Sequence, residues 1–136
     1  MKLVWNKQEL PNKGWWKLTR KYVVSKFRKQ TYGVIDSSEL EDLLNSEKQL
    51  TIVDCRLEDT YCKFGHIPGA VSYPITLFEN DCPEIERDRQ LVVVCYFGFV
   101  CQLAARKLGA QGHKDVLILK GGMDAWNIKN RPLELL

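Results

Sequence analysis

One stretch decides the fold of this chain: Leu91-Val92-Val93-Val94-Cys95-Tyr96-Phe97-Gly98-Phe99-Val100-Cys101. It opens with four consecutive apolar residues, three of them β-branched, which is typical of a strand buried on both faces of a parallel sheet. A helical pattern begins at Cys101, and its spacing is carried by Leu103, Ala104, Lys107 and Leu108. Gly109 is expected to end this helix. The stretch therefore predicts a strand, a short loop and a helix.

Cys95 stands at the carboxyl end of this predicted strand. The carboxyl ends of parallel strands are where α/β folds place their chemistry. Backbone N–H groups of the following loop, together with the positive end of the helix dipole, favour a thiolate over a thiol. Gly98 lets the loop bend without a Cβ clash, so the amides of residues 96–101 can converge on the sulfur. We therefore predict that Cys95 is a nucleophile.

Strand and helix signals alternate along the rest of the chain. Strands are predicted at residues 34–35, 49–53, 71–73, 91–95 and 116–119. Helices are predicted after a cap at Ser37 or Ser38, near residues 58–61, from Pro83 to Glu86, from Cys101, and after Gly121-Gly122. This alternation predicts an α/β fold whose central, mostly parallel, five-stranded sheet is flanked by helices on both faces.

Composition narrows the class of protein. A chain of 136 residues fits one domain, and its apolar runs fall far short of the ~20 residues that span a membrane. Without a signal-peptide core at the start, the five cysteines are expected to be free thiols in a reducing cytoplasm. The cysteines lack Cys-x-x-Cys spacing and the two histidines flank no cysteine cluster. We therefore expect no metal site and no cofactor.

Charge divides the chain into a basic arm, residues 1–32, and a mildly acidic domain, residues 33–136. The arm holds nine Lys and Arg residues against the single acidic Glu9. Its larger apolar residues recur at roughly helical spacing: Trp15, Leu18, Tyr22, Val23 and Phe27. Such an arm can contact an anionic membrane surface, an acidic partner or the domain itself, and nucleic acid is not expected.

Three separated segments resemble the rhodanese-like (sulfurtransferase) family over about residues 33–130. They are Asp54-Cys55-Arg56 with Tyr61 and Gly65-His66-Ile67-Pro68-Gly69-Ala70, then Cys95 with Gly98, then Leu119-Lys120-Gly121-Gly122-Met123-Asp124-Ala125-Trp126. The resemblance implies a single rhodanese-like domain. It also implies that the Cys95 thiolate takes a sulfane sulfur, holds it as a persulfide and passes it to a nucleophile.

The loop after Cys95 departs from that family in its charge. Members that use thiosulfate commonly carry a basic residue beside the cysteine or at the end of the loop, where this chain has Tyr96 and Val100. With Phe97 and Phe99, the rim is aromatic and uncharged, a poor receptor for a small dianion. Phosphatases on the related fold clamp an oxyanion with Cys-x5-Arg. Because Cys101 replaces that arginine, phosphatase activity is not expected.

The remaining motif residues are expected to be structural. Asp54 and Arg56 are expected to form a buried or half-buried ion pair that ties a strand to a neighbouring loop, and His66 to be a hydrogen-bonded turn residue. Cys55 is interpreted as an inert core residue. Cys101 leaves two interpretations open: a small core residue at the helix start, or a resolving thiol that attacks a Cys95 persulfide.

The sequence thus favours a sulfurtransferase or persulfide carrier with Cys95 as the nucleophile. The expected donors and acceptors are polysulfide, a small thiol or a protein thiol, with polysulfide or a protein persulfide preferred over thiosulfate. The alternative is a catalytically silent rhodanese-like module that binds or regulates another protein through its aromatic loop.

Overall fold

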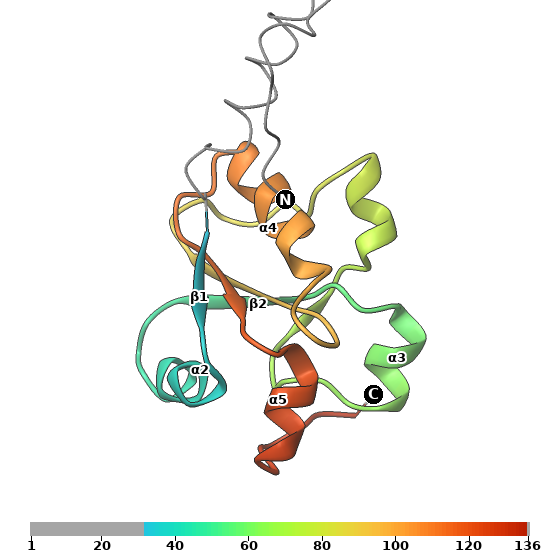
Figure 1. Cartoon of the computed structure of the whole chain (residues 1–136). Helices are drawn as coiled ribbons and strands as arrows, with labels where there is room; N and C mark the ends of the chain where they lie inside the picture. Colours follow the sequence, from blue (N-terminus) through green and yellow to red (C-terminus); the bar gives the residue numbers. More distant parts are fainter. Residues whose placement is uncertain (1–31, 136) are drawn as a thin grey trace, which may run out of the picture. The chain divides into compact units, whose positions relative to one another are not determined.

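Five parallel strands form the centre of the fold that the computed structural model describes, which comprises residues 32–135 (Figure 1). The strands are β1 (Gly33–Ile35), β2 (Leu50–Asp54), β3 (Val71–Ser72), β4 (Gln90–Val94) and β5 (Val116–Leu119), in the spatial order β1-β5-β4-β2-β3. Every neighbouring pair is parallel. The predicted α/β fold with five strands is confirmed, and the strand that precedes Cys95 is the central one.

Helices cover both faces of this sheet. They are α2 (Ser37–Leu44), α3 (Glu58–Lys63), α4 (Cys101–Ala110) and α5 (Gly122–Ile128), with a 3₁₀ turn, η2 (Ile75–Glu79), between β3 and β4. Side chains of β4 alternate between the two faces, as in any strand. Val93 packs with α4 and η2 in one core, the α4-side core. Val92 packs in a second core with α2, α3 and α5, whose largest side chain is Trp126.

The start of α2 differs in detail from the sequence prediction. The cap is Asp36, whose carboxylate accepts the N–H of Glu39 at 2.8 Å, while the Glu39 carboxylate accepts the N–H of Asp36 at 2.9 Å. This reciprocal pair is a capping box, which satisfies two backbone donors at once. Ser37 and Ser38, which the sequence predicts as caps, lie in the first turn of the helix instead.

Two further predictions about helices are wrong. The helix predicted at residues 83–86 is absent, and the stretch has no regular secondary structure. Cys82 and Ile85 instead pack against the α4-side core. The helix after Cys95 does not stop at Gly109 but continues to Ala110. The glycine that takes up the left-handed conformation is Gly112, with φ of 99°.

The predicted basic arm, residues 1–32, lies outside the described residues apart from Tyr32. Tyr32 is half-buried against the α4-side core. Among residues 32–135, the helices are too short or too polar to cross a membrane.

Candidate active site

Cys95 lies directly after β4, at the carboxyl edge of the sheet. All five residues of β4 are buried, and Cys95 itself is only 3% exposed. Its side chain belongs to the same core as Leu91 and Val93, on the α4 face of the sheet. A reactant can therefore reach this sulfur only across a small exposed area.

The loop after Cys95 turns a backbone amide toward the sulfur. The N–H of Gly98 donates to the Cys95 Sγ at 3.1 Å. Gly98 has a φ of 93°, which side chains rarely adopt, and a Cβ there would lie 3.2 Å from the backbone nitrogen of Gly121. Both the conformation and the close contact require glycine. The sequence prediction that this glycine allows the loop to bend around the sulfur agrees with this geometry.

The start of α5 holds the same loop from the other side. The Met123 and Asp124 amides donate to the carbonyl oxygens of Cys95 and Tyr96, at 2.8 and 3.0 Å. The approach is so close that a Cβ on Gly122 would lie 2.3 Å from the Cys95 carbonyl oxygen. These bonds satisfy the two carbonyl groups and hold the backbone of the loop in place beside the sulfur.

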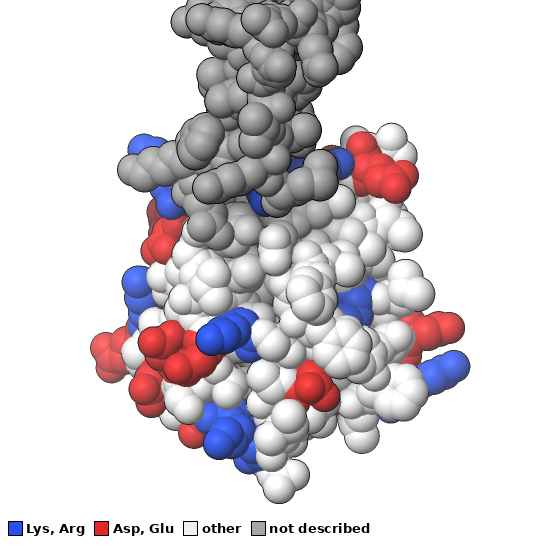
Figure 2. All heavy atoms as spheres, in the orientation of Figure 1, with Lys and Arg blue, Asp and Glu red and all other residues white. Residues whose placement is uncertain are grey.

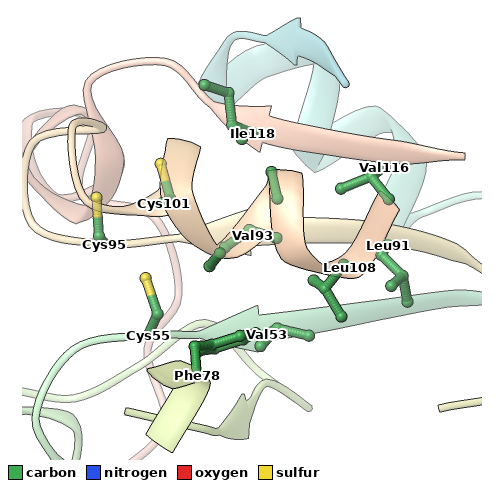
Figure 3. Packing of buried hydrophobic residues seen from close by; sticks show 12 residues of the cluster. Val53, Cys55, Phe78, Leu91, Val93, Cys95, Cys101, Leu108, Val116 and Ile118 are labelled. Carbon is green, nitrogen blue, oxygen red and sulfur yellow. The ribbon is translucent and has the colours of Figure 1, made fainter. Parts of the chain in front are cut away.

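Two more sulfur atoms lie beside Cys95. Cys55 follows β2 and Cys101 begins α4, and all three cysteines belong to one buried cluster. Figure 3 shows their three sulfurs together at one end of that cluster, where the strands end. All five cysteines of the chain are free thiols in the structure. The site therefore holds one potential nucleophile and two neighbouring thiols.

These neighbours decide how the three thiols ionise. Hydrogen bonds from the Cys101 and Cys55 thiols, and then from the amides of Cys101 and Gly98, hold the pKa of Cys95 well below its ordinary value, although burial opposes them. The hydrogen bond to Cys95 and burial raise the pKa values of both Cys55 and Cys101. One thiolate flanked by two protonated thiols is the stable arrangement, with the charge on Cys95.

The side chains of the loop face outward and carry no charge. Phe97 is 57% exposed and Phe99 is 77% exposed, and Tyr96 and Val100 are also exposed. Figure 2 shows a patch of uncharged side chains in the middle of one face of the molecule, bordered by scattered acidic and basic ones. The loop thus presents its backbone to the sulfur and an apolar rim to a reactant.

Asp54 and Arg56 brace the neighbouring strand rather than the sulfur. The Arg56 guanidinium donates to both carboxylate oxygens of Asp54, with a shortest distance of 2.7 Å, and both side chains are almost completely buried. The same guanidinium donates to the Gly65 carbonyl at 2.8 Å. The pair therefore ties the end of β2 to the loop at residues 65–70, as the sequence predicts.

His66 takes part in the same structural network. Its ring stacks on Tyr61 with 3.7 Å between the centroids, and its Nδ1 lies 3.2 Å from the Tyr61 carbonyl oxygen. Its Nε2 lies 3.5 Å from the Glu134 carboxylate, and its backbone pairs with that of Glu134. These contacts lock the turn to the end of the described chain and give His66 a structural place in the fold.

Comparison with known proteins identifies this arrangement. The family model of the rhodanese-like domain matches residues 36–129. The chain belongs to the rhodanese-like domain family. A crystal structure of a rhodanese-like domain protein from Staphylococcus aureus has the same fold, with a TM-score of 0.68 and 27% identity over 76% of this chain and 98% of that one.

Two curated sulfurtransferases are similar to this chain along most of their own length. The thiosulfate sulfurtransferase GlpE of Shewanella oneidensis is 38% identical over 87 residues, which are 64% of this chain and 85% of that protein. A sulfurtransferase of Allochromatium vinosum is 33% identical over 99 residues, which are 73% of this chain and 92% of that protein. The similarity thus extends through nearly the whole of both single-domain relatives.

Two features of this rhodanese-like site go beyond what the sequence analysis foresees. Cys55 is buried as predicted, but its contact with Cys95 is not anticipated by the interpretation of Cys55 as an inert core residue. The role of Gly122, whose missing side chain lets α5 approach the loop, is also missed. The paired glycines before Met123 are a signal that could have indicated such a close approach.

Proposed function

We propose that this protein is a rhodanese-type sulfurtransferase that carries sulfane sulfur as a persulfide on Cys95. The observation that carries the proposal is the Cys95 sulfur at the end of β4, which accepts a hydrogen bond from the Gly98 amide and lies in one buried cluster with the Cys55 and Cys101 thiols. A thiolate, not a thiol, is the nucleophile in sulfur exchange. The names of the two sulfurtransferase relatives support the same activity.

The proposed reaction has two displacements. The Cys95 thiolate attacks a sulfane sulfur of the donor, the donor S–S bond breaks, and the donor leaves as an anion one sulfur shorter. An acceptor thiolate then attacks the outer sulfur of the persulfide, and the electron pair of that S–S bond returns to Cys95. Each step is a thiol–disulfide exchange, so electrons and atoms balance without an added oxidant or cofactor.

We propose polysulfide or a protein persulfide as the donor in preference to thiosulfate. Tyr96, Phe97, Phe99 and Val100 form an exposed rim without a positive charge. A small dianion gains little from such a rim, whereas a slender sulfur chain can reach a nearly buried thiolate. The Shewanella relative is named a thiosulfate sulfurtransferase. Sulfur loading of this chain should therefore be measured with thiosulfate and with polysulfide side by side.

Cys101 is the proposed resolving thiol. It is buried in the α4-side core and also lies beside Cys95. Its position therefore allows both roles that the sequence leaves open, a small core residue and a resolving thiol. In the resolving step the Cys101 proton passes to the outer sulfur of the persulfide, the Cys101 sulfur attacks the inner sulfur, and the S–S bond breaks to release hydrosulfide and leave a Cys95–Cys101 disulfide. Cys101→Ser is expected to lengthen the lifetime of the persulfide and to remove that disulfide from peptide maps. An unchanged lifetime would leave Cys101 with a packing role only.

A second candidate is a catalytically silent module that docks a protein partner on the aromatic loop. The observation in its favour is the exposure of Phe97 and Phe99, since contiguous exposed apolar side chains often mark binding sites. The lowered pKa of Cys95 favours the enzyme, because a merely structural cysteine gains nothing from stabilisation of its thiolate.

Intact-protein mass spectrometry distinguishes the two. After incubation with polysulfide, the protein is expected to gain about 32 Da, the mass of one sulfur on a cysteine, and cyanide is expected to remove it as thiocyanate. Cys95→Ala should gain nothing, while Cys62→Ala, a matched loss of a thiol outside the cluster, should load like the wild type. Equal loading of Cys95→Ala would refute the assignment.

A further inference from the structure

Cys55 follows β2 at the position where Cys95 follows β4. The strand register pairs Asp54 with Val94, so the next residue on each strand is a cysteine. Paired residues of neighbouring parallel strands lie about 5 Å apart and point to the same face. Both cysteines accordingly belong to the α4-side core, and Figure 3 shows their sulfurs at the same end of it.

The Cys55 thiol has one proton to donate and two candidate acceptors, a carbonyl oxygen that it contacts and a sulfur of the same buried cluster. Its Sγ lies 3.1 Å from the Val94 carbonyl oxygen. That oxygen already accepts the backbone N–H of Cys55 at 2.8 Å, so it does not depend on the thiol for a partner. The other acceptor is the Cys95 sulfur. A hydrogen bond to an anion is roughly twice as strong as one between neutral groups. The Cys55 S–H is therefore expected to donate to the Cys95 sulfur when that sulfur is ionised, while Cys55 keeps its proton.

We propose that Cys55 is a positioning residue for sulfur transfer: its S–H points to the Cys95 sulfur when that sulfur is a thiolate and returns to the Val94 carbonyl when Cys95 is loaded. This inference rests on the proposed function. In a persulfide the negative charge lies on the outer sulfur, and the inner sulfur is a weak acceptor. When an acceptor removes the outer sulfur, the electron pair returns to Cys95, and the Cys55 S–H stabilises the thiolate that leaves.

The groups that face this pair fit the role. At the start of α4, the Cys101 thiol is a second donor to the Cys95 sulfur and also lowers the pKa of Cys95. At the end of β2, the hydrogen bond to Cys95 and burial raise the pKa of the Cys55 thiol, and the nearby Asp54 carboxylate, which is paired with Arg56, contributes less in the same direction. Cys55 therefore stays protonated over the neutral range and remains a donor. Because a thiol of lower pKa leaves faster, the predicted effect falls on the step that delivers sulfur.

The test is the pH dependence of Cys95 alkylation by iodoacetamide, with the modified residue identified by peptide mass. Cys55→Val keeps an apolar, strand-compatible side chain of similar size but removes the S–H. The midpoint of the alkylation profile is expected to rise by about one pH unit or more, the shift for one lost hydrogen bond to a charged group. Cys55→Ser restores a donor and should stay within about half a unit of the wild type.

The matched control is Cys62→Val, which removes a thiol that lies outside this cluster and should leave the midpoint unchanged. An unshifted midpoint in Cys55→Val, or an equal shift in Cys55→Ser, would overturn the proposal in favour of packing alone. If Cys55→Val does not fold, Cys55→Ala supplies the same comparison. Alkylation needs no sulfur donor, so a shifted midpoint in a protein that loads no sulfur would refute the proposed function and the role of Cys55 in sulfur transfer, and would leave only its hydrogen bond to the Cys95 thiolate.

Discussion

The two loops that carry the family motifs are built in opposite ways. The loop at residues 96–100 turns its backbone inward, where the Gly98 amide meets the Cys95 sulfur, and turns its aromatic side chains outward. The loop at residues 65–70 turns its side chains inward, with His66 and Ile67 buried and the Gly65 carbonyl held by Arg56. The first is suited to chemistry, and the second holds the fold together.

This difference determines which substitutions each loop tolerates. Where the backbone makes the contact, any side chain that allows the same conformation preserves it, and only glycine positions are constrained. Where buried side chains make the contact, their identity is constrained, because an unpaired buried charge is strongly destabilising.

Arg56→Ala is expected to have the largest effect. It leaves the buried Asp54 carboxylate without its partner and should lower the free energy of unfolding by about 3–5 kcal/mol, measured by urea denaturation. The matched change at an exposed pair, Arg89→Ala, removes a contact to Glu86 and should cost less than about 1 kcal/mol. Similar losses in the two variants would mean that the buried pair does not hold the 65–70 loop.

Gly98→Ala is expected to act on the chemistry. The added Cβ meets the Gly121 nitrogen and strains a residue at φ of 93°, so the amide should move off the Cys95 sulfur. Sulfur loading from polysulfide should fall by about tenfold, the effect of roughly 1.4 kcal/mol.

Gly69→Ala is the matched control for that change. Gly69 also has a positive φ, of 79°, but nothing lies within 4 Å of its Cβ position. Its strain should lower stability by about 1 kcal/mol without slowing sulfur loading. If the two variants load sulfur equally slowly, strain in the fold rather than the Gly98 amide explains the loss.

The pH profile of Cys95 gives a third test. Because its pKa lies below the ordinary value, the rate of Cys95 alkylation should stay constant as the pH falls from 9 through neutrality, and should decline only below the folded pKa. A small free thiol, with a pKa of about 8.5, should already lose reactivity across that range. Parallel profiles for the two would show that the loop does not stabilise the thiolate.

Phe99→Ala is expected to have the smallest effect. The side chain is 77% exposed and lies on the loop that contacts Cys95 through its backbone. The free energy of unfolding should change by less than about 0.5 kcal/mol, and sulfur loading from polysulfide should remain as in the wild type. A large loss of loading would show that the rim itself binds the donor.

Much of the fold could be predicted because its signals are local. The run of β-branched residues before Cys95 identifies the central strand, and Gly98 indicates the tight loop, because both depend on the conformations of consecutive residues. The wrong helix at residues 83–86 shows the limit of local signals. Pro83 is a residue that suits the start of a helix, yet this stretch has no regular secondary structure. Its residues Cys82 and Ile85 pack against the α4-side core, which is a tertiary contact that no local signal reports.

The parallel α/β class and the uncharged rim could be read from the sequence, as could the cysteine that we propose as the nucleophile. Only the tertiary structure decided that Cys55 and Cys101 flank Cys95 and that the amides of α5 hold its loop. The physical reason is that the register between β2 and β4 joins residues 40 positions apart in the chain, and no local preference specifies it. Burial of the β2 and β4 side chains in the cores on the two faces of the sheet fixes that register, and the three sulfurs then lie at one end of one of these cores.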